Sequence, residues 1–124
     1  MLRQKQSEFA LNVVKLLKFM DDRGYEFTLG EVYRPSYVQR FLIKIGKSWT
    51  KNSQHSLKLA IDVNLFKNGK YLSSSSAHHE CGKYWESLSL YNVWGGRFRD
   101  GNHYEMRHDL PRNRLRRGKY HKSL

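Results

Sequence analysis

The chain has 124 residues, which is enough for one domain of ordinary size and too few for two. Hydrophobic residues make up 39% of it and aromatic residues 14%, so the composition excludes an intrinsically disordered chain. The net charge of +12 favours polyanionic partners, such as nucleic acid, an anionic membrane surface or an anionic cell envelope.

Helix and strand signals alternate in the first part of the chain. Apolar residues at spacings of three and four predict a helix over 3–21, and Gly24 fits its C-terminal cap. Aromatic and β-branched residues predict a strand over 25–34. Pro35 then breaks this pattern, and a second helix is expected over 36–44.

The middle of the chain predicts a β-hairpin. LAIDVNLF at 59–66 alternates strictly, with three aliphatic side chains on one face and Asp62 on the other. Asn-Gly at 68–69 is the strongest short-range hairpin signal, so we expect a return strand near 70–72.

The rest of the chain contains one more helix and one more strand signal. We expect an exposed serine-rich loop at 73–77, a helix over 78–91, a glycine-rich bend at 93–98, a strand over 103–108 and a basic surface tail over 109–124. The pattern contains no βαβ alternation. It predicts an α+β fold with a small, mainly antiparallel sheet and about three helices in a single compact domain.

Export and membrane signals are missing from the pattern. No stretch approaches the roughly 18 apolar residues of a membrane-spanning helix, and we expect no membrane span. The basic N-terminus is not followed by an apolar core with a cleavage site, so we expect synthesis in the cytoplasm without a signal peptide. The single cysteine, Cys81, cannot form an intramolecular disulfide and is expected to be a semi-buried filler.

Two residues suggest a metal site at the start of the alternating strand. Asp62 lies in an otherwise apolar strand, where a carboxylate must be paired, hydrogen-bonded or metal-bound. His55 lies seven residues upstream, a separation that spans roughly 23 Å in an extended chain. The two side chains can share one ion only if the segment 56–58 turns back.

A second polar group follows the glycine-rich bend. Asp100 precedes His103 by three residues, so a loop carboxylate and a strand histidine can lie close together. Three protein ligands with an open position suit a catalytic zinc ion, and an adjacent carboxylate can move protons. The plainer alternative is an ion-paired core aspartate with two structural histidines. His78 and His79 open the third helix and are expected to be exposed.

Both motifs together resemble a known family. S-x-H-x(6)-D, followed by W-G-G-x-F-x-D-x-x-H-Y-E, is similar to the zinc peptidases of the D-alanyl-D-alanine carboxypeptidase (VanY-like) family. That family includes the L-alanyl-D-glutamate endopeptidases that bacteriophages use as endolysins. The resemblance runs from about Glu31 to Glu105, and the motifs occur in the right order.

The resemblance implies a zinc cofactor and a role for each matching residue. His55, Asp62 and His103 correspond to the three zinc ligands. Asp100 corresponds to the general base that then protonates the leaving amine, and Arg34 corresponds to an arginine that binds the substrate and stabilises the oxyanion. Ser53 and Gln54 correspond to substrate-contacting positions, and Tyr84 and Trp85 to a structural helix. Glu105 is either a partner of His103 or an exposed strand residue.

Under this resemblance, 1–108 is a zinc peptidase domain and 109–124 a basic tail. The implied substrate is the peptidoglycan stem peptide, cleaved at L-alanyl-D-glutamate by a monomeric phage endolysin. This enzyme would act on the cell wall in the periplasm during host lysis, and the basic surface would bind the anionic envelope. Such an enzyme would have antimicrobial activity.

Two departures from the family pattern bear on the site. Lys58 stands where many members have glycine, at the bend between the first two ligands, and lysine adopts a positive φ less readily. Asp100 stands where many carboxypeptidases have glutamate, which favours the endopeptidase branch.

Three alternatives remain open from the sequence. One is D-alanyl-D-alanine carboxypeptidase activity within the same family. A metal-dependent nuclease would use His78, His79, Asn92 and His103, but it requires the last histidine on a helix. A nucleic-acid-binding protein would use the basic tail and exposed aromatic residues.

Overall fold

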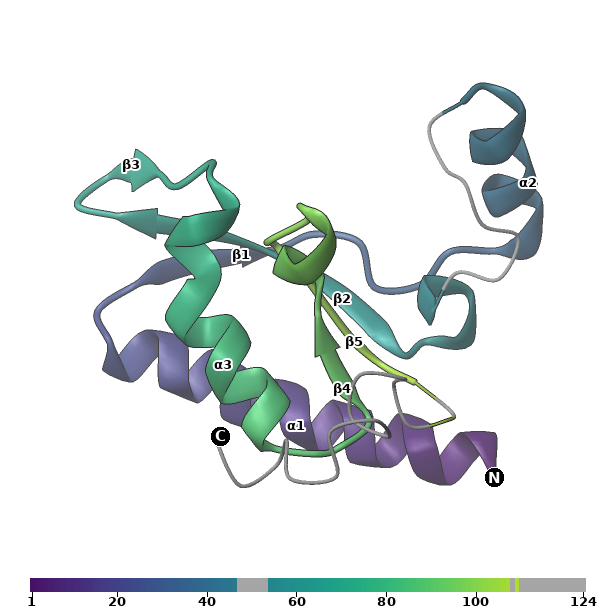
Figure 1. Cartoon of the computed structure of the whole chain (residues 1–124), viewed down its shortest axis with the longest axis horizontal. Helices are drawn as coiled ribbons and strands as arrows, with labels where there is room; N and C mark the ends of the chain where they lie inside the picture. Colours follow the sequence, from purple (N-terminus) through teal and green to yellow (C-terminus); the bar gives the residue numbers. More distant parts are fainter. Residues whose placement is uncertain (47–53, 108, 110–124) are drawn as a thin grey trace.

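Strand β2 (Ala60–Lys67) is the centre of a five-stranded antiparallel sheet (Figure 1). The computed structural model of the chain describes residues 1–46, 54–107 and 109. The sheet order is β1 (Glu26–Leu29), β2, β5 (His103–Met106) and β4 (Asn92–Trp94). The short β3 (Lys70–Tyr71) pairs with the end of β2.

Two helices cover one face of this sheet (Figure 1). Helix α1 (Leu2–Asp22) and helix α3 (His79–Ser87) contact each other, and α1 also contacts β1 and β5. The buried apolar core lies between the helices and the sheet. It consists of Phe9, Leu16, Met20, Leu59, Ile61, Val63, Leu65, Cys81, Trp85, Tyr104 and Met106. The α+β class, the antiparallel sheet and the single domain are therefore confirmed.

Strand alternation gives the sheet two chemically different faces. In β2 the residues Ile61, Val63 and Leu65 are buried against the helices, while Asp62 is only half-buried and points to the other side. In β5 the core residues Tyr104 and Met106 alternate with polar ones in the same way. The face without helices therefore collects the polar residues of β2 and β5.

The turns flanking β2 both require left-handed backbone. Asn68 (φ 53°) and Gly69 (φ 77°) form the predicted hairpin turn before β3. At the other end, the 3₁₀ helix η1 (Gln54–Leu57) is followed by Lys58 with φ 58°. Lys58 thus keeps the left-handed angle despite its side chain, at a cost of roughly 1–2 kcal/mol. The predicted bend between His55 and Asp62 is confirmed.

Several predicted boundaries were wrong by a few residues. The strand expected over 25–34 ends at Leu29, because Asp62 then bonds to both Gly30 and Glu31, two residues opposite one as in a β-bulge. The helix expected over 78–91 ends at Ser87, whose hydroxyl bonds to the Tyr84 carbonyl.

The glycine-rich bend also contains more structure than expected. It contains β4 and the 3₁₀ helix η3 (Gly95–Phe98), and the last strand ends at Met106. Another 3₁₀ helix, η2 (Ser75–His78), occupies part of the serine-rich loop. Cys81 is fully buried rather than semi-buried. The basic tail at 109–124 lies, apart from its first residue, outside the described residues.

The expected exposure of His78 was wrong. His78 is buried at the start of α3, and its Nδ1 lies 2.7 Å from the Tyr104 hydroxyl. His79 is exposed, as expected. The amphipathic pattern places Cys81 and Trp85 toward the core, and His78 lies within reach of Tyr104 only because β5 packs against this helix.

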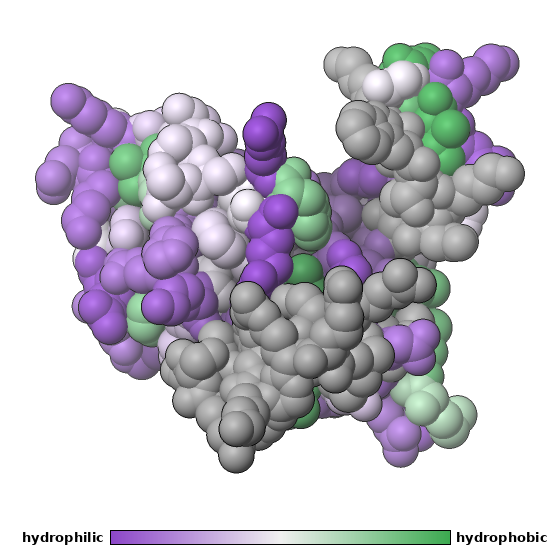
Figure 2. Space-filling model, viewed as in Figure 1, coloured by the Kyte–Doolittle hydropathy of each residue, from purple (hydrophilic) through white to green (hydrophobic). Residues whose placement is uncertain are grey.

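Helix α2 (Ser36–Lys44) stands apart from the other elements (Figures 1 and 2). Figure 2 shows the molecular surface hollowed between α2 and the rest of the chain. Tyr37 and Phe41 on this helix are exposed. None of the helices in the described part of the chain has the length and apolar composition of a membrane span.

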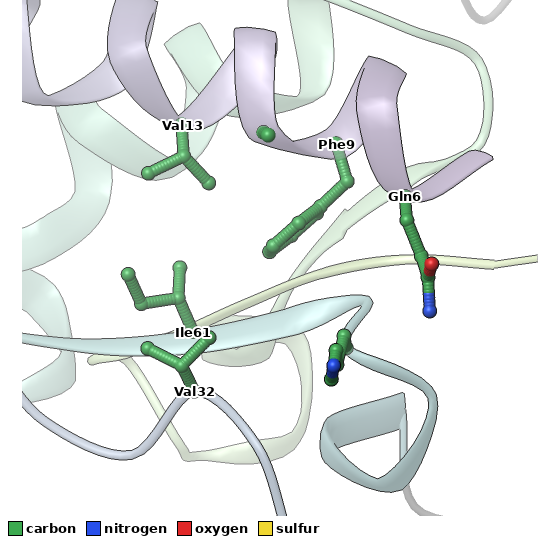
Figure 3. Close-up of a pocket in the computed structure, with 7 residues that line it drawn as sticks. Gln6, Phe9, Val13, Val32 and Ile61 are labelled. Carbon is green, nitrogen blue, oxygen red and sulfur yellow. The ribbon is translucent and has the colours of Figure 1, made fainter. Parts of the chain in front are cut away.

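An apolar cavity of about 320 Å³ lies between α1 and the start of β2 (Figure 3). Phe9 and Val13 of α1 point into it, toward Ile61 of β2 and Val32. Because Ile61 and Asp62 face opposite sides of the strand, this cavity opens on the helix-covered face and is separated from the polar face.

The buried His78 predicts a loss of stability in acid. Burial lowers the pKa of His78 to about 4, while an unfolded histidine has a pKa near 6.5. Between these two pH values, His78 binds a proton in the unfolded chain but not in the folded chain. This contribution is fully present above about pH 6.5 and is lost as the pH falls toward 4, by about 3 kcal/mol.

Chemical unfolding of the wild type and His78→Gln at pH 7 and pH 4.5 checks this. We expect the wild type to lose about 2–3 kcal/mol more than the variant between these two pH values. His79→Gln changes the exposed neighbour and should behave like the wild type. Equal losses in the wild type and His78→Gln would contradict the assignment.

Candidate metal centre

Three side chains meet on the polar face of the sheet. Asp62 of β2 and His103 of β5 are register partners, and Asp62 Oδ1 lies 3.1 Å from His103 Nδ1. His55 comes from η1, and its Nε2 lies 3.3 Å from the same carboxylate oxygen. The ligand atoms of the three residues all lie within 4.8 Å of one another.

Each histidine is held by its second ring nitrogen. His55 Nδ1 lies 3.1 Å from the Val32 carbonyl oxygen, to which it donates, so its other ring nitrogen, Nε2, faces Asp62. His103 Nε2 lies 2.7 Å from Glu105 Oε1, which leaves Nδ1 toward the cluster. This arrangement is typical of metal-binding histidines, whose outer nitrogen bonds to a carbonyl or carboxylate.

Glu105 is itself fixed by a neighbouring cation. It is buried, and Arg107 Nε donates to its Oε2 at 2.5 Å. Burial alone would raise the pKa of Glu105, but the hydrogen bonds from His103 and Arg107 outweigh it and lower this pKa. Of the two interpretations offered by the sequence, Glu105 is therefore the partner of His103 and not an exposed strand residue.

The cluster keeps its aspartate ionised. Burial opposes ionisation of Asp62, but hydrogen bonds from His103 and His55 dominate and lower the pKa of Asp62 to about 2. For His103, burial is outweighed by Asp62 and Glu105, which raise its pKa to about 9. A metal ion bound here would displace a proton from His103, so binding would strengthen as the pH rises.

The donor set fits a zinc ion. Two imidazole nitrogens and one carboxylate oxygen are ligands that zinc accepts, and three protein ligands with one open position are typical of catalytic sites. Bond lengths of 2.0–2.2 Å in a tetrahedron place donors about 3.3 Å apart. The distances of 3.3 and 3.1 Å from Asp62 Oδ1 match this separation. Within the described residues this is the sole group of three or more such ligands.

Asp100 lies beside this cluster, in the turn between η3 and β5. The turn is closed by bonds from Asp100 N to Gly95 O (2.9 Å) and from His103 N to Asp100 O (3.0 Å). A Cβ at Gly95 would lie 2.1 Å from the Asp100 carbonyl and 2.8 Å from His103 Cβ, so only glycine permits this approach. The backbone thus brings Asp100 and His103 to the same place.

The carboxyl of Asp100 is electrostatically coupled to the cluster. Although the residue is exposed overall, the atoms around its carboxyl remove part of its hydration, and this burial raises its pKa. Asp62 and Glu105 also raise this pKa, whereas His103 and His55 lower it. A carboxyl with a raised pKa is better suited to accept and return a proton near neutral pH.

Arg34 lies next to His55 and is held by two partners. Its Nε donates to Glu31 Oε1 at 2.8 Å, its Nη2 contacts the same oxygen, and its Nη1 donates to Gln39 at 2.5 Å. The Arg34 amide donates to the His55 carbonyl at 3.1 Å. The backbone of Arg34 is therefore bonded to that of His55, and much of the hydrogen-bonding capacity of its guanidinium is already used by Glu31 and Gln39.

The contacts of Glu31 and Gln39 with Arg34 were not predicted from the sequence. Gln39 is buried although it lies in an exposed helix, and a buried amide requires a partner. For Glu31, the available signal was its position three residues before Arg34, close enough in the chain for the two opposite charges to pair. Among the described residues, the buried Gln54 Oε1 has no hydrogen-bond partner, and Ser53 lies outside the described residues.

The nuclease alternative receives no support from the positions of its residues. His103 lies on a strand and not on a helix. His78 bonds to Tyr104, and the metal-binding group found in the described part of the chain does not include it.

Comparison with known proteins agrees with this geometry. The sequence model of D-alanyl-D-alanine carboxypeptidase matches residues 46–106, which contain all three candidate ligands and Asp100. Among solved structures, the chain is similar to the L-Ala D-Glu endopeptidase ChiX of Serratia marcescens, with 18% identity, a TM-score of 0.64 and 85% of each chain covered. At this identity the likeness shows a shared fold. No curated protein matches the chain.

The bond between Glu105 and His103 predicts a lower metal affinity when it is removed. Glu105→Ala leaves His103 free to rotate and less basic, so we expect zinc affinity to fall by roughly 10–100-fold. Competition with a chromogenic chelator measures the dissociation constant. Glu26→Ala removes a carboxylate from β1 at an exposed position and should leave it unchanged. An unchanged affinity in Glu105→Ala would contradict the assigned role.

Proposed function

Since the chain belongs to the D-alanyl-D-alanine carboxypeptidase family of peptidases, we propose that its site binds zinc and hydrolyses an amide bond in the stem peptides of peptidoglycan. The observation that carries this proposal is the convergence of His55, Asp62 and His103 on one point, with Asp100 beside it. Ligands, orienting partners and a proton-transfer group are then all supplied by this one chain.

The residues of the chain divide the chemical work. Zinc, when bound, polarises the amide carbonyl and lowers the pKa of water. His55, Asp62 and His103 hold the ion, and Val32 and Glu105 fix the two imidazole rings. Asp100 takes a proton from the attacking water and returns it to the nitrogen of the leaving amine. Arg34 donates hydrogen bonds to the carbonyl oxygen as negative charge develops on it.

Glu31 and Gln39 prepare Arg34 for this role. Two partners hold the guanidinium beside His55, so the arginine does not have to be ordered when the substrate binds. Its side chain is 16% exposed, which leaves a limited surface for the substrate to contact.

We favour the L-alanyl-D-glutamate bond as the target. Aspartate at position 100 supports this choice, as does the fold shared with an L-Ala D-Glu endopeptidase. The competing target is the terminal D-alanyl-D-alanine bond, the substrate named for the matching family. The net charge of +12 suits an enzyme that works on an anionic cell envelope. From the resemblance of its sequence motifs, we propose that the protein is a phage endolysin.

Digestion of purified peptidoglycan tests this function. We expect new N-terminal D-glutamate by mass spectrometry, lost on chelation and restored by zinc. Released D-alanine instead would assign the enzyme to the carboxypeptidase reaction with the same zinc chemistry. Absence of both products with zinc present would overturn the peptidase proposal for this substrate.

The role of Asp100 is tested separately from zinc binding. Asp100→Asn keeps the size of the side chain but cannot accept the proton, so kcat should fall by about 10²–10⁴-fold. The zinc dissociation constant should change little, because Asp100 is not among the ligands. A variant that hydrolyses the substrate at the wild-type rate would exclude Asp100 as the general base. Loss of zinc together with activity would make it a structural residue.

A further inference from the structure

A small polar pocket is lined in part by Asp100. Its volume is about 150 Å³, and its lining is mostly polar. The walls come from the segment that joins β3 to η2 and from the turn before β5. Its polar lining includes Ser73, Ser74, Ser75, Arg99, Asp100 and Asn102.

The pocket has a fixed position relative to the metal ligands. Gly101 N donates to Ser75 Oγ at 3.0 Å, and a Cβ at Gly101 would lie 2.4 Å from Ser75 Cα, so the two walls are in close contact. Val63 N donates to the Asn102 carbonyl at 2.9 Å, which fastens the pocket to the strand of Asp62. The pocket is therefore held at a set distance from the reacting centre.

Arg99 supplies the positive charge of this pocket. Its backbone is left-handed (φ 63°, ψ 31°), a conformation that costs a non-glycine residue roughly 1–2 kcal/mol. Residues in such conformations cluster at functional sites. Across residues 1–46, 54–107 and 109, no acidic side chain pairs with the Arg99 guanidinium. An unpaired guanidinium and serine hydroxyls are suitable donors for a carboxylate.

In both candidate reactions the leaving residue carries a carboxylate close to its nitrogen. Asp100 protonates the leaving nitrogen, so the residue that leaves must lie against it. If that residue is a terminal D-alanine, its α-carboxylate is attached to the carbon that bears the leaving nitrogen. If it is D-glutamate, only one of its two carboxyl groups can be joined to the next residue, so the other remains free.

We propose that the pocket beside Asp100 is a carboxylate-binding subsite for the leaving residue, with Arg99 as the cation and the hydroxyls of Ser73–Ser75 as further donors. This inference rests on the proposed peptidase function and adds a requirement for the substrate. The enzyme selects substrates whose leaving residue carries a free carboxylate, and amidation of that group weakens them.

Ligand binding tests the subsite without depending on hydrolysis. D-Alanine and D-glutamate, together with their α-amides, are titrated into the zinc-loaded protein and followed by NMR shifts of backbone amides. We expect the wild type to bind the free acids at least about tenfold more tightly than the amides, because a charge-assisted hydrogen bond is lost on amidation. Arg99→Asn tolerates the left-handed backbone and should remove this preference.

Two further variants separate charge from structure. Arg99→Lys keeps a cation and should retain a measurable part of the preference. Arg3→Gln removes an exposed arginine of α1 and should bind all ligands like the wild type. Equal binding of acids and amides by the wild type, or binding of neither, would overturn the subsite. A preference unchanged in Arg99→Asn would overturn the role of Arg99.

Kinetics with matched peptides complete the test. With a free leaving-residue carboxylate, Arg99→Asn should lower kcat/KM by about tenfold or more, mainly through KM. With the amidated peptide, Arg99→Asn and the wild type should be equal. If neither peptide is hydrolysed while the free acids still bind preferentially, the proposed function fails and the subsite stands. If both peptides are hydrolysed equally well and the free acids bind no better than the amides, the subsite fails and the proposed function stands.

Discussion

The antiparallel pairing of β2 with β5 is the constraint on which the site depends. The register sets Asp62 opposite His103 and Ala60 opposite Glu105. Because side chains alternate along both strands, one register places Asp62, His103 and Glu105 on one face and Ile61 and Tyr104 in the core. A slip of one residue would turn Asp62 and His103 into the apolar core, so the hydrophobic pattern that folds the protein also positions the candidate site.

Charge pairing offsets the free-energy cost of burying ionisable groups on this polar face. Asp62, His103 and Glu105 are all partly or fully buried, and a buried charge without a partner is costly. They form a continuous chain that ends at Arg107, whose side chain reaches the surface. The hydrogen bonds that satisfy these buried groups also fix the direction of a candidate ligand, His103, so stability and preorganisation have the same physical origin.

A second anchor positions the turn that carries Asp100. Glu86 of α3 is buried and receives two bonds from Arg97, at 2.7 and 2.6 Å, and one from the backbone of Trp94 at 3.0 Å. The Trp94 indole packs against Gly96 and Gly82, where a larger residue would clash. The core helix thus holds η3 in place, and η3 determines where Asp100 and Arg99 lie.

The sequence by itself determined the local features and the choice of candidate ligands. The alternation of 59–66, the Asn-Gly turn and the apolar periodicity of α1 depend on neighbours in the chain, and they predicted β2, its hairpin and the first helix. The spacing from His55 to Asp62 required a bend, and its resemblance to a zinc peptidase motif pointed to His55, Asp62 and His103 as candidate ligands. Tertiary structure alone decided the rest, because strand pairing and burial join residues far apart in sequence. It placed His78 against Tyr104, His103 beside Asp62 and Ser75 against Gly101.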